Sequence, residues 1–212
     1  MLRKFSRSGH YLQILLILAV SFLYLFSPHP GFEVQAFSEN AAPLGRWLTG
    51  ILPENDMAIR IASLTLILMN AAGFNMILNH HDLTPRQSLF TTLIASVFFL
   101  FTGQAVAIIA PLTALLLLLF SLHSAMKLYA ESYPYTLVLN ASICVAIASM
   151  IYPLAILFAF FIWMAFFTLR VSSWREWVIS LTGLTVPYIY LAFWFFWNDR
   201  LNIALNEYQA YL

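Results

Sequence analysis

The chain has 212 residues, of which 62% are hydrophobic and only 9% charged, and its formal net charge is +1 at pH 7. Ordinary soluble domains carry about 25% charged residues, so this composition is typical of a protein built into a lipid bilayer. The weak charge excludes nucleic acid as a partner. The lone Cys144 excludes an internal disulfide and a thiolate metal cluster, and we expect no metal and no cofactor.

Five apolar runs follow one another along the chain and predict membrane helices. They cover residues 11–27, 57–79, 88–122, 136–169 and 178–197. Basic residues precede the first run, which we interpret as a retained anchor and not as a cleaved signal peptide. No soluble domain fits between the runs. We therefore expect a single all-α membrane domain over residues 1–212, with the lipid bilayer as its first partner.

Two of the runs, 88–122 and 136–169, are longer than one crossing requires. At 1.5 Å per residue each would reach about 52 Å, against a hydrocarbon core of about 30 Å. Turn-forming residues lie near the middle of each run, at Thr102-Gly103-Gln104 and at Tyr152-Pro153. We expect two short hairpins, which makes the fold a polytopic bundle of about seven transmembrane helices. Five long helices, tilted or kinked, are the alternative.

Basic residues in the short loops predict how the chain is oriented. With seven crossings, one side carries seven basic loop residues and the other side two. The first set is Arg3, Lys4, Arg7, Arg86, Lys127, Arg170 and Arg175, and the second set is Arg46 and Arg200. We therefore expect a multi-pass protein of the bacterial inner membrane, with a cytoplasmic amino terminus and an external carboxyl terminus.

The external loop over residues 28–56 contains a stretch with helical periodicity. Between residues 42 and 52, Leu44, Trp47, Leu48 and Ile51 recur at helical spacing, and prolines bound the stretch on both sides. This pattern predicts a short amphipathic helix lying in the membrane interface. The external tail, residues 198–212, has a similar apolar stripe and is expected to lie along the outer surface.

The candidate site combines acidic residues of this external loop with Arg60, which follows the loop in the second apolar run. Arg60 lies about one turn inside the second apolar run, at a depth where a charge is costly unless it pairs, snorkels or faces water. A guanidinium there suits a lipid phosphate, with Asp56 beside it. Glu33 or Glu39 could then act as general base toward an acceptor hydroxyl. The alternative is that Asp56 and Arg60, four residues apart, form an ordinary helix-end ion pair.

Other polar residues of the second run have a simpler interpretation. We expect the amides of Asn70, Asn75 and Asn79 to bond to neighbouring helices. The adjacent His80 and His81 point about 100° apart in a helix, which suits shared metal ligation poorly.

The order of these parts resembles the membrane module of the C-type polytopic glycosyltransferases. Local support comes from HHDLTPRQSLF and from NASICVAIASMIYPLAILFAFF, which is similar to the small-residue helix, turn and hydrophobic helix of that module. In that superfamily the first external loop carries a catalytic acid, and the sugar arrives on a polyprenyl phosphate. The resemblance implies that Glu33 best matches the loop acid and that Glu39 is second.

The chain departs from that pattern in two ways. Those enzymes usually have an aspartate in the loop, and they continue with more helices or an external domain. The alternative is therefore a non-catalytic scaffold or subunit of an envelope complex, with a membrane-protein partner or a second copy of the chain. The stretches RVSSWREWVISLTGLTVPYIYL and NHHDLTPRQS are also similar to an uncharacterised family of bacterial integral membrane proteins.

Overall fold

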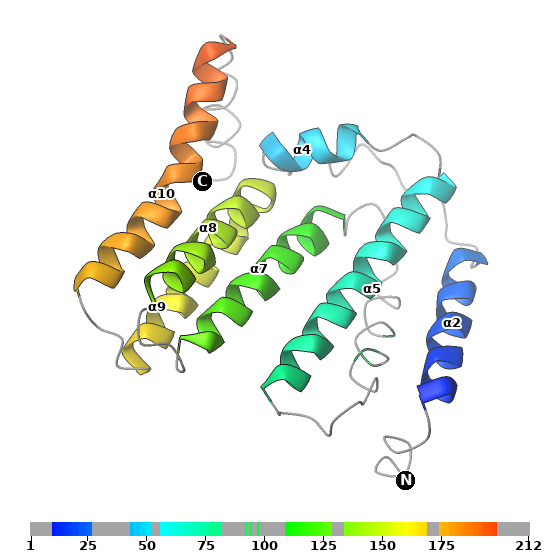
Figure 1. Ribbon diagram of the computed structural model, residues 1–212. Coiled ribbons are helices and arrows are strands. Elements are labelled where there is room, and N and C mark those ends of the chain that lie inside the picture. Colours follow the sequence, from blue (N-terminus) through cyan, green and yellow to red (C-terminus); the bar gives the residue numbers. More distant parts are fainter. Residues whose placement is uncertain are drawn as a thin grey trace. The chain divides into compact units, whose positions relative to one another are not determined.

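The computed structural model describes residues 10–26, 43–51, 56–81, 92, 94, 97, 109–128, 134–168 and 174–198 (Figure 1). Regular structure in these ranges is entirely helical, which confirms the predicted all-α class. Three helices are long and apolar enough to cross a membrane, namely Met57–His80, Ile109–Lys127 and Trp174–Trp197. The chain divides into two compact units. One comprises Met1–Gln35 with Leu52–Leu112, and the other Ala36–Ile51 with Thr113–Leu212.

In the first unit, helix α2 (His10–Phe26) packs against helix α5 (Asp56–His80). The Tyr24 hydroxyl and Ser63 Oγ are 3.0 Å apart at this contact and share a hydrogen bond. The buried residues of α5 recur mostly every three or four positions, as expected for one face of a helix. Its buried residues are Ile59, Ser63, Ile67, Asn70, Ala71, Asn75 and Ile77.

Asn70 ties α5 to the start of helix α7 (Ile109–Lys127). Its Nδ2 donates to the carbonyl of Leu66, at 2.8 Å, and to that of Leu112, at 3.0 Å. The second bond joins segments 42 residues apart. This amide therefore bonds to a neighbouring helix, as the sequence predicts.

In the second unit, the chain is interrupted between helix α8 (Tyr135–Ile151) and the 3₁₀ turn η1 (Pro153–Leu157). Tyr152 is extended, with φ −135° and ψ 106°. The proline ring disfavours helical geometry in the preceding residue, and proline has no N–H to continue the ladder. The amide of Ala155 then bonds to the carbonyl of Tyr152 at 2.9 Å and closes the turn.

Helix α9 (Phe158–Thr168) follows the turn and packs against α8. Both helices contribute to one hydrophobic cluster, to which the end of α7 also belongs. Its buried members are Ala125, Leu128, Val138, Ala141, Val145, Ala159, Ile162 and Phe166. Small residues on α8 let the larger side chains of α9 approach closely, which is typical of packing between membrane helices.

Helix α10 (Trp174–Trp197) packs along α8. It begins four residues before the apolar run at 178, and Glu176 in its first turn is favourably placed at the positive end of the helix dipole. Trp177 is surrounded by aromatic side chains of α9, with ring centroids 5.8 Å from Trp163 and 5.4 Å from Phe167.

Helix α4 (Pro43–Gly50) lies within residues 42–52, where the sequence predicts a short helix, and it packs against α8 (Figure 1). Trp47 on its outer face is 65% exposed. Other predictions fall outside the described residues: the turn at Thr102-Gly103-Gln104 and the surface helix expected beyond Asn198. The count of seven crossings therefore stays a prediction.

Candidate functional site

Arg60 lies in the first turns of α5, where its Nη1 donates to the carbonyl of Leu25 at 3.4 Å. Leu25 belongs to the last turn of α2, whose carbonyls lack partners within that helix. A cation is favourable there because the carboxyl end of a helix carries partial negative charge. The half-buried guanidinium thus joins the end of one helix to the start of another.

The other predicted site residues are not described to the same extent. Asp56 is the first residue of α5, but its side chain lies outside the described part of the structure. Glu33 and Glu39 also lie outside it. Their convergence with Arg60 on one cavity, and the pairing of Asp56 with Arg60, remain predictions.

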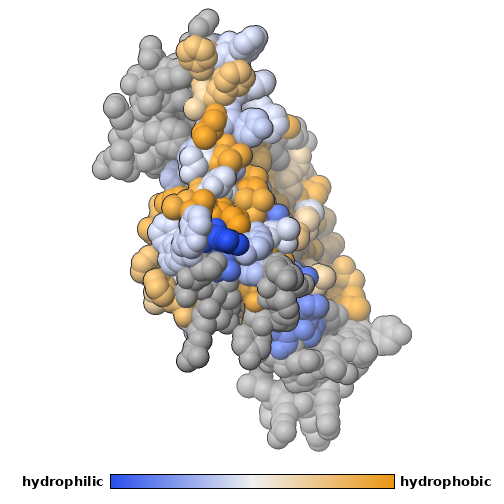
Figure 2. Space-filling view, turned by 60° about the vertical axis from the view of Figure 1, so that its left-hand side comes forward, coloured by the Kyte–Doolittle hydropathy of each residue, from blue (hydrophilic) through white to orange (hydrophobic). Residues whose placement is uncertain are grey.

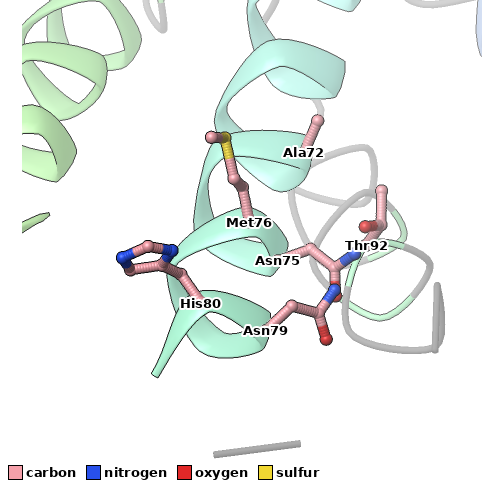
Figure 3. A pocket seen from close by; sticks show the side chains of 6 residues that line it. All are labelled: Ala72, Asn75, Met76, Asn79, His80 and Thr92. Atoms are coloured by element: carbon pink, nitrogen blue, oxygen red, sulfur yellow. The ribbon is translucent and has the colours of Figure 1, made fainter. Parts of the chain in front are cut away.

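A polar hollow lies at the opposite end of α5. Its volume is about 520 Å³, and it is lined by Ala72, Asn75, Met76, Asn79, His80 and Thr92. Figure 3 shows the amides of Asn75 and Asn79 turned toward Thr92, whereas the imidazole of His80 points away from them. Asn75 and Thr92 are each only 6% exposed. We name this feature the polar hollow.

Two buried oxygens of the polar hollow have no hydrogen-bond partner in the part of the chain that the structure describes. They are Asn75 Oδ1 and Thr92 Oγ1. Buried polar groups in native proteins are nearly always hydrogen-bonded, and one left without a partner costs about 1–3 kcal/mol. The polar hollow therefore offers two oxygens that can accept hydrogen bonds from a bound ligand.

The sequence pointed to only part of this hollow. It marked Asn75 and Asn79 as amides that bond to other helices, whereas the structure shows both lining the hollow. Thr92 was missed, because a threonine in the apolar stretch LFTTLIAS has no feature that separates it from an ordinary helix residue. Only the fold brings Thr92 to Asn75.

Metal chemistry has no support in the described residues. Among them, no three histidine, cysteine, aspartate or glutamate side chains lie close enough together to hold an ion. His80 and His81 meet edge to face, with ring centroids 5.2 Å apart.

Serine and tyrosine hydroxyls line the contact between α8 and α10. Ser142 Oγ and Ser180 Oγ are 2.9 Å apart, and Ser149 Oγ and the Tyr188 hydroxyl are 2.7 Å apart. Trp163 of α9 also donates its Nε1 hydrogen to Ser180 Oγ, at 3.2 Å. We call these four hydroxyl residues the serine seam. It joins helices to one another, as polar side chains commonly do inside membranes.

Comparisons with protein-family models, with curated proteins and with solved structures give no match. The fold itself defines a class: an all-helical protein with helices suited to crossing a membrane.

Proposed function

We propose that the chain is an integral protein of the bacterial inner membrane, with a seven-helix module like that of the C-type glycosyltransferases. In this proposal it acts on or beside a polyprenyl-phosphate-linked sugar at the outer face. The observation that carries the proposal is the position of Arg60, a half-buried cation where α2 ends and α5 begins. Such a charge is a functional-site candidate by default in a membrane helix.

The lengths of the helices support the seven-helix count. Helix α7 has 19 residues and α8 has 17, which correspond to about 25–29 Å at 1.5 Å per residue. Each is close to the roughly 30 Å of the hydrocarbon core. After the break at Tyr152, η1 and α9 together supply another 16 residues, from Pro153 to Thr168. The 136–169 run is thus long enough for two crossings.

The place of α4 supports the proposed orientation. Leu44 of α4 lines an apolar hollow of about 470 Å³ together with Met150 of α8 and Trp194 of α10. Met150 and Trp194 lie near the carboxyl ends of their helices, so both helices end on the side where α4 lies. This matches a topology in which α8 and α10 run outward and α4 lies at the external interface.

In the proposed mechanism, the guanidinium of Arg60 contacts oxygens of the lipid phosphate, since its planar fork matches phosphate geometry. Asp56 orients the guanidinium from the first turn of the same helix. Glu33, or failing that Glu39, accepts the proton of the acceptor hydroxyl as its oxygen attacks the anomeric carbon of the sugar. The bond between that carbon and the phosphate oxygen breaks, and polyprenyl phosphate leaves with its negative charge beside Arg60.

Native mass spectrometry of the protein released from membranes tests the phosphate site. The wild type should carry polyprenyl phosphate, and Arg60→Gln should lose most of it, because the neutral amide cannot neutralise the phosphate. Arg175→Gln is the matched control, since Arg175 is exposed in the first turn of α10. Equal lipid occupancy in the wild type and Arg60→Gln would rule out the phosphate role.

The catalytic part of the proposal has a separate test. Glu33→Gln should abolish transfer of sugar from the polyprenyl phosphate to an acceptor while leaving the far-ultraviolet circular dichroism spectrum unchanged. Glu39→Gln separates the two candidate bases: it should retain turnover if Glu33 is the base, and lose it if Glu39 is. Undiminished transfer by Glu33→Gln would remove Glu33 from the mechanism.

The second candidate function is a non-catalytic scaffold or subunit of an envelope complex. It is favoured by the outer face of α9, where large apolar side chains are exposed: Phe160, Phe161, Met164 and Phe167. Figure 2 shows hydrophobic and near-neutral colours over most of the described surface on one face, with strongly hydrophilic colour only in small patches. A stoichiometric membrane protein or second copy in the mass spectra, with no bound lipid phosphate, would favour this candidate.

A further inference from the structure

We infer that the polar hollow binds a neutral, polyhydroxylated group such as a sugar ring. This site is distinct from the proposed phosphate position. Asn75 lies fifteen residues after Arg60 on the same helix, which is about 22 Å along its axis. The inference therefore concerns a second ligand site and goes beyond the function proposed above.

The charge of the lining residues selects the class of ligand. Among Ala72, Asn75, Met76, Asn79, His80 and Thr92 there is no carboxylate. A buried ammonium or metal cation without a negative partner is strongly disfavoured. An anion would find no lysine or arginine among these residues, and the amide oxygen of Asn75 would repel it. A neutral hydroxyl donates to these oxygens without bringing a charge into the site.

A hydroxyl group also fits the two oxygens individually. Asn75 Oδ1 accepts hydrogen bonds, and Thr92 Oγ1 both accepts and donates. A hydroxyl donates one hydrogen bond and accepts others, so neighbouring hydroxyls on one ring can satisfy both oxygens together. Ala72 and Met76 supply an apolar wall for the C–H face of such a ring.

The size of the polar hollow favours a small molecule over a single water. Its volume of about 520 Å³ lies within the roughly 300–1,000 Å³ typical of ligand pockets. A water molecule takes up about 30 Å³ in the liquid. A single water would therefore occupy only a small part of this volume, whereas a hexose ring with its hydroxyls fits within it.

The full-length protein in nanodiscs, prepared with a sugar-free detergent, tests this inference with three probes. They are glucosyl diacylglycerol, diacylglycerol without the sugar, and free methyl glucoside. Binding is measured by native mass spectrometry and by the shift of the unfolding midpoint. We expect the glucosyl lipid to bind and the plain diacylglycerol not to bind. Binding of methyl glucoside as well would identify a free sugar as a sufficient ligand.

Thr92→Val is the main variant, because it removes the hydroxyl and keeps the shape. We expect it to bind the glucosyl lipid about tenfold more weakly, which corresponds to one lost hydrogen bond. Thr65→Val is the matched control. Thr65 is exposed on α5 and its hydroxyl donates to the carbonyl of Ile61 within the same helix, so this variant should bind the glucosyl lipid as tightly as the wild type.

A second variant keeps the test decisive if Thr92→Val does not fold. Met76 is 67% exposed and lines the polar hollow, so Met76→Trp should fill it from the open side and abolish binding. Arg60→Gln should bind the glucosyl lipid like the wild type, which separates this site from the phosphate site. Absence of binding by both sugar probes, or equal affinity in the wild type and Met76→Trp, would overturn the inference.

Discussion

Single residues decide how closely the helices of the second unit approach one another. Gly183 of α10 faces α8, where a methyl group on its Cα would lie 2.8 Å from Ser142 Cβ and 3.1 Å from the carbonyl oxygen of Leu139. The second of these neighbours is backbone and cannot rotate away. Gly183 is therefore required for the close contact that brings Ser142 within hydrogen-bond distance of Ser180.

Gly183→Ala should separate α8 from α10 and destabilise the protein by about 1–3 kcal/mol, the usual cost of overpacking a tight interface. Thermal unfolding in detergent measures this effect. Gly50→Ala is the control, because a methyl group at Gly50 has no atom within 4 Å, and its stability should stay within about 0.5 kcal/mol of the wild type. An unchanged unfolding midpoint for Gly183→Ala would contradict the close packing.

At the scale of elements, helix pairing in the second unit combines small residues with hydroxyl pairs. The serine seam supplies two hydroxyl contacts between α8 and α10, and α9 adds an indole donor to one of them. Hydrogen bonds between membrane helices contribute only about 0.6 kcal/mol each on average. The seam therefore sets the register of the helices more than it supplies their stability.

Tyr188→Phe tests one contact of the seam, since it removes the hydroxyl that meets Ser149. We expect a loss of about 0.6 kcal/mol, because Ser149 keeps its second bond to the carbonyl of Ala146. Tyr190→Phe, two residues later and exposed, should have no effect. Chemical denaturation of the two variants side by side gives the difference, and equal stabilities would mean that the hydroxyl of Tyr188 contributes nothing.

At the scale of the whole molecule, the number of crossings decides on which side of the membrane Lys127 lies. With seven crossings Lys127 lies in the cytoplasm, whereas five long helices place it outside. Alkaline phosphatase fused after Lys127 should therefore be inactive, and the same reporter fused after Trp197 should be active. Activity at both positions would favour five crossings, because the enzyme is active only outside the cytoplasm.

The sequence by itself determined the elements whose cause is local. Apolar runs predicted the helices that became α2, α5, α8, α9 and α10, and the periodicity of residues 42–52 predicted α4. The break at Tyr152 was also predictable, because a proline restricts the residue before it whatever surrounds the chain. The sequence also indicated Arg60 as a candidate site residue, since a charge in an apolar run is costly in any membrane fold.

Only the tertiary structure decided which polar side chains meet. Ser142 and Ser180 are 38 residues apart, Ser149 and Tyr188 are 39 apart, and Asn70 reaches a carbonyl 42 residues away. Each of these side chains looks ordinary in its own helix. Their partners follow from how the helices pack, as does the presence of Asn75 and Thr92 in one hollow, and no local sequence pattern predicts that packing.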